Sequence, residues 1–182
     1  SLFVETSEGY SWTYQLYYSN NLITKITNSL GGTTEFKYDT SDRLLHLQGG
    51  SGRTSYYYTN GLLSSVEFKD NRDYTRTTYL FYNSLNQMNK SITNENDREY
   101  SNFYKYDTKD RLIESNDEFG NLEKYVYDNA NNTFKNVYPQ MGHRHNFGWI
   151  APLINNVIMH DRLHSENLTY QYTYDSDNYP IL

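Results

Sequence analysis

Runs of alternating residues recur along the chain, and each run ends in a polar turn. In the run at 169–174, Tyr170, Tyr172 and Tyr174 would share one side of an extended strand, with threonine and glutamine on the other side. Tyrosine and threonine also favour strands. Aspartate, asparagine, serine and glycine follow, and their short side chains bond the local backbone and tolerate left-handed geometry. The pattern therefore predicts one β-strand before each turn and a second strand after it.

Seven segments of this kind can be laid over one another, and they begin at residues 13, 34, 54, 77, 102, 123 and 169. The tyrosines that directly precede the turns are Tyr18, Tyr38, Tyr58, Tyr82, Tyr106, Tyr127 and Tyr174. Their successive gaps are 20, 20, 24, 24, 21 and 47 residues, so we expect one copy near the end to have drifted or been replaced. Asn60-Gly61 is a strong hairpin signal. Each copy is therefore predicted to be a β-hairpin.

Hairpins joined end to end predict an all-β fold, an antiparallel meander of roughly a dozen strands. The 182 residues fit one domain, 1–182. Neither side of the strands is purely apolar, and the chain has 21 tyrosines. We therefore expect a large curved sheet with a wet face and stacked tyrosines on neighbouring strands. A sheet of this size tends to curl or split, which predicts an open, barrel-like trough or two sheets folded together.

Residues 138–167 depart from the alternation. They contain four of the five histidines and the most apolar stretch of the chain, "WIAPLINNVIM". We expect an irregular insertion here, in which a short helix or a loop plugs one end of the sheet. A ligand-binding lid is the alternative interpretation.

Composition and charge exclude several classes of protein. The net charge is -6 and no basic patch dominates, so neither nucleic acid nor anionic lipid headgroups are expected partners. No apolar run approaches the ~20 residues of a membrane helix, and the predicted strands are too polar on both sides for a membrane pore. Cysteine is absent, which excludes disulfides and thiol catalysis within this sequence.

The stretches "FKYDTSDRLLHL", "YKYDTKDRLIES" and "YQYTYDSDNYPIL" resemble the repeats of a domain of unknown function in secreted lipoproteins of Bacteroides-type gut bacteria. That family is assigned a porin-like fold. Its terminal pattern, Tyr-x-Tyr-Asp-x-Asp-Gly-Tyr-Pro, matches Tyr172, Tyr174, Asp175, Asp177, Asn178, Tyr179 and Pro180, with asparagine in place of glycine. The resemblance implies an open porin-like barrel, export to the periplasm or the outer-membrane surface, and a tether through an N-terminal lipidated cysteine outside this sequence. It implies no activity and no catalytic residue. A weaker resemblance is to the tyrosine-aspartate repeats of large bacterial shell-forming toxins, because only "SDRLL" and "KDRLI" approach their turn.

Candidate catalytic and metal-binding residues are few. His143 and His145 are two residues apart and His160 and His164 are four apart, so each pair could share a face, but no zinc motif surrounds them. The acidic turns "DSDN" and "NEND" lack the glycine and the final glutamate of a calcium loop. There is no nucleophile elbow, phosphate loop or dinucleotide-binding pattern. We therefore expect no metal site, no cofactor and no catalytic site. A glycan-directed hydrolase that uses acidic or histidine residues near 138–167 is the alternative.

Aromatic side chains are the remaining candidates for function. Trp12, Tyr57 and Trp149, together with Tyr17 and Tyr79, are expected to be partly exposed, and such rings stack on sugars or grip extended peptides. A purely structural role for each ring is the alternative, because so many tyrosines cannot all be buried. The sequence thus predicts a non-enzymatic, exported binding or surface-interaction module of the bacterial envelope. Its expected partner is a glycan or another envelope protein.

Overall fold

The computed structural model describes residues 2–7, 10–20, 22–130, 157–162, 168–178 and 180–181. The chain divides into two compact units, Ser1–Thr77 and Thr78–Leu182, and every regular element described in them is a β-strand. None of the described residues belongs to a helix with the length and apolarity needed to cross a bilayer. The expectation of one domain over 1–182 stays a prediction.

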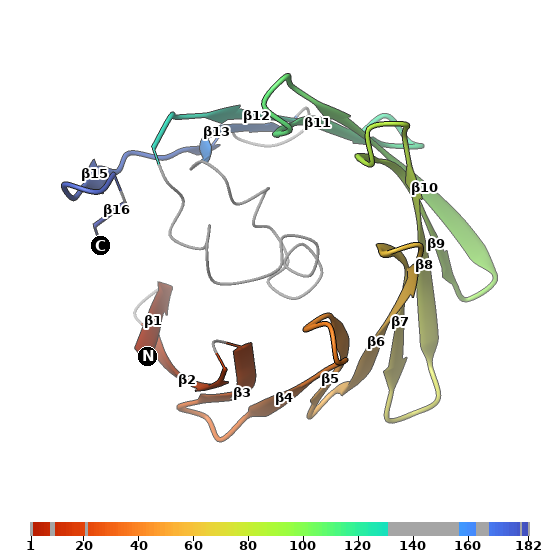
Figure 1. Cartoon of the computed structure of the whole chain (residues 1–182), viewed down its shortest axis with the longest axis vertical. Helices are drawn as coiled ribbons and strands as arrows, with labels where there is room; N and C mark the ends of the chain where they lie inside the picture. The colour runs from red at the N-terminus through yellow and green to blue at the C-terminus, as the bar shows by residue number, and fades with distance from the viewer. Residues whose placement is uncertain are drawn as a thin grey trace. The chain divides into compact units, whose positions relative to one another are not determined.

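In the first unit the strands lie side by side in sequence order, each antiparallel to the next (Figure 1). They are β1 (Leu2–Ser7), β2 (Tyr10–Ser19), β3 (Leu22–Asn28), β4 (Thr33–Tyr38), β5 (Leu44–Gly49), β6 (Gly52–Thr59) and β7 (Leu62–Asp70). The predicted hairpin at Asn60-Gly61 joins β6 to β7, and both turn residues have positive φ, 51° and 82°. Positive φ at both positions is the geometry of a type I′ turn.

The second unit continues the same order. Strand β8 (Thr75–Tyr82) crosses the unit boundary. It is followed by β9 (Met88–Glu95), β10 (Arg98–Tyr106), β11 (Leu112–Asp117), β12 (Leu122–Tyr127), β13 (Val157–Arg162) and β14 (Leu168–Thr169). Strands β9 to β14 pair antiparallel with their neighbours, which confirms the predicted all-β antiparallel meander.

The strand predicted at 169–174 is interrupted. Strand β14 ends at Thr169, and a separate pair, β15 (Thr173–Tyr174) with β16 (Pro180–Ile181), forms a two-stranded sheet. The turn between β15 and β16 contains Asn178 at φ 61°, so asparagine occupies the left-handed position as expected.

The predicted insertion at 138–167 lies largely outside the described residues, but its part at 157–162 is the regular strand β13. Val157 pairs with Tyr127 directly beside a register shift, as Leu44 pairs with Tyr38 and Leu112 with Tyr106. Val157 therefore takes the place of the first leucine of a return strand. The expectation of an irregular segment was therefore wrong for 157–162, and for the rest of 138–167 it lies outside the described residues.

One face of the strands carries the core. Buried side chains recur at the first or second residue of four return strands, namely Ile23 in β3, Leu44 in β5, Leu63 in β7 and Leu112 in β11. Alternate residues of the neighbouring strands, such as Phe36, Tyr56 and Tyr125, join them on the same face. In the second unit Leu112, Tyr125 and Tyr127 form one buried cluster, with Tyr104 and Tyr106 packed against it. Tyrosine rings thus supply much of the core, as the composition required.

Four of the tyrosines that precede turns fasten their hairpin to the preceding strand. The hydroxyl of Tyr58 donates to the carbonyl of Leu44 at 3.0 Å, and that of Tyr127 donates to the carbonyl of Leu112 at 2.6 Å. Tyr38 and Tyr106 make the same bond to Ile23 and Met88. Tyr174 differs, because its hydroxyl donates to the carboxylate of Asp128. These bonds let a partly buried ring satisfy its one polar group at a backbone carbonyl.

Candidate functional site

Two turns, one in each unit, share an aspartate-centred geometry. Asp39 begins the turn between β4 and β5, and Asp107 begins the turn between β10 and β11. In each turn the carboxylate oxygen Oδ1 accepts two backbone N–H bonds, from residues two and four positions later, at 2.8–2.9 Å. The fourth residue of each turn, Asp42 or Asp110, has φ near 60°. Aspartate tolerates this left-handed conformation, and the first aspartate replaces missing backbone partners, so the pattern Asp-Thr-x-Asp-Arg specifies the turn.

The arginine that ends each turn binds back to the aspartate that begins it. Asp39 Oδ2 accepts from Nε and Nη2 of Arg43, both at 2.7 Å, and Asp107 Oδ2 accepts from the same atoms of Arg111 at the same distance. The guanidinium carbons then lie over tyrosine rings of the next hairpin, 4.8 Å from the centroid of Tyr58 and 5.1 Å from that of Tyr127. We call each set of aspartate, arginine and tyrosine a turn clamp. It combines a charge-assisted pair with a cation–π contact.

The clamps keep their aspartates ionised. The backbone N–H of Arg43, opposed by desolvation and supported by the Arg43 side chain, lowers the pKa of Asp39. Burial raises the pKa of Asp107, but the hydrogen bonds from Arg111 and from the backbone of Lys109 outweigh it, so the net shift is downward. A carboxylate held in this way is a poor proton donor near neutral pH, which makes these aspartates unsuited to general-acid chemistry.

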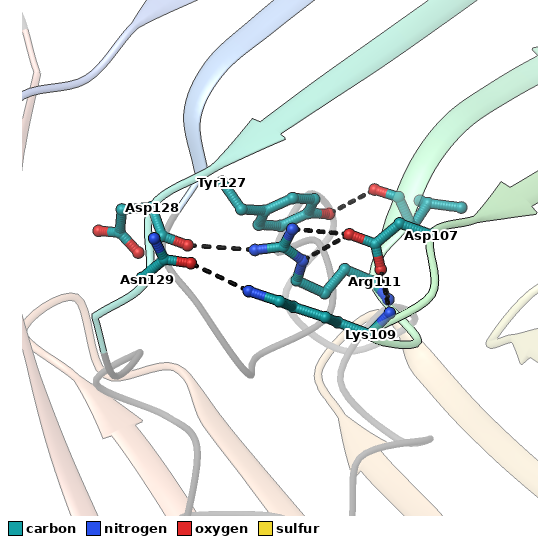
Figure 2. Close-up of polar contacts among 7 residues, drawn as sticks. Asp107, Lys109, Arg111, Tyr127, Asp128 and Asn129 are labelled. Atoms are coloured by element: carbon teal, nitrogen blue, oxygen red, sulfur yellow. Dashed lines mark hydrogen bonds and ion pairs between the residues drawn. The ribbon is translucent and has the colours of Figure 1, made fainter.

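The second clamp has further partners in the turn after β12. Figure 2 shows the Arg111 guanidinium between Asp107 and the backbone carbonyl of Asp128, which accepts from Nη1 at 3.1 Å. Lys109 donates through Nζ to Asn129 Oδ1 at 3.2 Å. The carboxylate of Asp128 also accepts from the Tyr174 hydroxyl. This clamp is therefore joined to two later parts of its unit.

A neutral version of the same turn lies between β8 and β9. Asn83 Oδ1 accepts from the backbone of Leu85 and Gln87, as the aspartates do, and Asn83 donates from Nδ2 to Gln87 Oε1 at 2.8 Å. Gln87 in turn donates to Asp110 at 2.8 Å. The backbone conformation of the turn thus needs the side-chain oxygen at its first position and not the negative charge.

The opposite face of the first unit is polar and aromatic. Register places a row of side chains across β2 to β7, each opposite the next, and its members are Tyr17, Lys25, Glu35, Gln48, Arg53 and Lys69. A neighbouring row holds Lys37, His46, Ser55 and Glu67. Tyr57 lies one step further along β6 on the same face and is 49% exposed. We call this surface the cationic face, because it carries four lysine or arginine side chains and two carboxylates.

On the second unit, the face opposite the core has an exposed aromatic ring, and its charges alternate in sign across β10 to β13, in the order Lys105, Glu114, Lys124 and Asp161. Phe103 is exposed, and Lys90, its partner in register, has Nζ 5.5 Å from the ring centroid. Lys105 Nζ is 2.6 Å from the carboxylate of Glu114, and Glu114 is next to Lys124 across the following strand pair. Alternating charges of this kind stabilise cross-strand neighbours and leave little net field.

The structure places only some of the predicted ligand-stacking residues. Tyr57 is exposed on the cationic face, and Tyr17 and Tyr79 are exposed as well. Trp12 lies in β2, but its side chain is outside the described part, and Trp149 is outside it altogether. His143, His145 and His164 also lie outside the described residues, and so does the side chain of His160 in β13. Within the described ranges no group of three or more histidine, aspartate or glutamate side chains could hold a metal ion.

Sequence reasoning missed the turn clamps and the bulges beside them. The pair Asp-x-x-x-Arg occurs in both "DTSDR" and "DTKDR", and this shared spacing was the available signal. Register shifts follow on the return strands and leave one extra residue there, Thr24, Leu45, Ser64, Ile113 or Ile158. Such bulges have no composition of their own, which explains why the pattern did not reveal them.

No family model matches this chain, and no curated protein matches it. Among solved structures, a porin-like protein from Bacteroides uniformis is similar with a TM-score of 0.66, at 15% sequence identity, over 98% of this chain and 84% of that chain. A TcdB2-TccC3-TEV structure covers 99% of this chain and 12% of its own, at 11% identity and a TM-score of 0.33, which carries no argument. The first likeness shows the fold, so the predicted porin-like fold is confirmed.

Proposed function

We propose that this chain is a non-catalytic binding module of the bacterial envelope, and that it binds its partner on the sheet face opposite the tyrosine–leucine core. The porin-like fold of a Bacteroides protein supports the envelope setting. A glycan is the first candidate partner and another envelope protein is the second. Anchoring through a lipidated cysteine outside this sequence remains part of the proposal.

The observation that carries the proposal is the exposure of aromatic rings beside lysines on this face. Lys25 Nζ lies 5.7 Å from the Tyr17 ring centroid, and Phe103 and Lys90 repeat the arrangement in the second unit. An exposed ring offers an apolar surface to the C–H face of a sugar, and the adjacent ammonium donates hydrogen bonds to hydroxyls or carboxylates. Tyr57 and Phe103 are exposed in the middle of strands, where their rings are accessible to a partner.

A glycan array and a pull-down from envelope extract test the proposal. Tyr57→Ala and Phe103→Ala should weaken capture of the same partner that the wild type binds, because each removes a ring and leaves the core intact. Phe119→Ala is the matched control, since Phe119 is an exposed ring in the turn between β11 and β12. Absence of any specific partner at high protein concentration, or equal loss in all three variants, would refute a binding role for this face.

A further inference from the structure

We propose that the cationic face of the first unit binds an acidic polysaccharide, whose carboxylate or sulfate groups meet Lys37 and Arg53 while its sugar rings stack on Tyr17 or Tyr57. This inference rests on the proposed binding function and names the class of ligand.

The face differs in charge from the chain that carries it. The whole sequence has a net charge of -6, yet this face has Lys25, Lys37, Arg53 and Lys69 against Glu35 and Glu67. Many of the chain's carboxylates lie instead in turns, such as Asp39 and Asp107, or at the strand ends that lead into turns, such as Asp70 and Asp117. A local positive field on an acidic protein selects for an anionic partner.

Two of these cations are available to a ligand. Lys69 is held by Asp73 at 2.9 Å, and Lys25 lies between the Tyr17 ring and Glu35. In the described part of the chain neither Lys37 nor Arg53 has a carboxylate within ion-pair distance. Both side chains are exposed, so binding would cost little desolvation.

His46 joins the two cations into one cluster. Register places His46 opposite Lys37, and Nη2 of Arg53 lies 3.0 Å from His46 Nδ1. Arg53 donates to a neutral imidazole here, and the other guanidinium N–H groups remain for a ligand. Burial first, and then the charges of Arg53 and Lys37, lower the pKa of His46, which keeps the ring neutral at neutral pH. A guanidinium presents paired donors that match the two oxygens of a carboxylate or sulfate.

Aromatic rings border this cluster along the strands and favour a glycan over other polyanions. Tyr57 projects from β6, the strand that carries Arg53, and Tyr17 shares a cross-strand row with Arg53. Single-stranded nucleic acid also combines anions with stacking groups. It depends, however, on many phosphate contacts, and the two unpaired cations of this cluster supply few of them.

Isothermal titration of the full chain with polygalacturonate, with a sulfated glycosaminoglycan and with neutral dextran tests the inference. Polyglutamate serves as a polyanion without sugar rings. A single-stranded oligonucleotide tests whether nucleic acid binds instead. We expect binding of at least one acidic glycan, weakened by salt, and weak or no binding of the other three probes. The two acidic glycans distinguish carboxylate from sulfate as the bound group.

The double variant Lys37→Gln/Arg53→Gln should weaken that binding roughly tenfold or more, because two charge-assisted contacts are lost. Lys109→Gln, which removes one exposed charge from a turn of the second unit, is the matched control and should leave it unchanged. Equal binding of polyglutamate or the oligonucleotide would overturn the assignment to glycan. Binding of dextran or of an envelope protein alone would overturn this inference and leave the proposed function standing, whereas failure of every partner would remove both.

Discussion

The turn clamps of the two units have the same internal geometry and different surroundings. Every aspartate–arginine contact is 2.7 Å in both, yet the Arg43 side chain is 42% exposed and the Arg111 side chain is 14% exposed. The difference comes from the next hairpin. After Tyr58 the chain makes the two-residue turn at Asn60-Gly61, which in the described part of the chain offers Arg43 no hydrogen bond, whereas the Asp128 carbonyl accepts from Arg111. Local sequence therefore fixes the shape of a clamp, and the neighbouring turn decides how far it is shielded from water.

The largest expected effect does not distinguish the clamps. Leu44→Ala and Leu112→Ala each remove a side chain that is 1% exposed, so each should lower the free energy of unfolding by about 2–5 kcal/mol. Urea denaturation measures the loss, and hydrogen exchange locates it in the first or second unit. Leu85→Ala, at an exposed turn position, is the control. A loss under about 1 kcal/mol in either core variant would show that this leucine does not anchor the core of its unit.

The arginines should separate the two copies. Arg111→Ala removes the pair with Asp107, the bond to the Asp128 carbonyl and the contact with Tyr127, so we expect a loss of about 2 kcal/mol. Arg43→Ala should cost less than about 1 kcal/mol, because solvent already screens its pair. Thermal unfolding of both variants compares them directly. Equal losses would mean that the turn after β12 contributes nothing to the second clamp.

The tyrosine hydroxyls give a smaller contrast. Tyr127→Phe leaves the Leu112 carbonyl without its buried donor and should cost about 1–2 kcal/mol. Tyr58→Phe breaks a longer bond at a less buried ring, and about 0.5–1 kcal/mol is expected. Phenylalanine keeps the ring packing, so urea midpoints report on the hydroxyl alone. A larger loss for Tyr58→Phe than for Tyr127→Phe would reverse this ranking.

Acidification should weaken both clamps by the same mechanism. The folded-state pKa values of Asp39 and Asp107 are below their unfolded values, so the stability from ionisation is present above about pH 4 and is lost as pH falls through the lower, folded pKa. Asp107→Asn should reduce this pH dependence, because the neutral turn at Asn83 keeps the same backbone bonds. The free energy of unfolding of the wild type and of Asp107→Asn, measured from pH 7 to pH 2, tests this prediction. An unchanged acid slope in Asp107→Asn would exclude Asp107 as a contributor.

Strand alternation and turn residues were enough to predict the meander, since Asn60-Gly61 and the tyrosines before the turns obey local rules. The strand β13 was not predicted, because Val157 continues the pattern after a connection that hid the spacing. The contact between His46 and Arg53 joins neighbouring strands and depends on register, which bulges shift. Burial of Arg111 was equally invisible, because it depends on a turn 17 residues later.

The bonds from tyrosine hydroxyls to backbone carbonyls reach back only one hairpin, over 14 to 18 residues of sequence. Strands held in this way behave as a repeat array, because each of these hydroxyl bonds joins a hairpin only to the one before it. Whole hairpins can then be gained or deleted by recombination without disturbing hairpins further along the chain. A long connection such as the one between β12 and β13 is tolerated wherever the next strand still pairs with the one before it.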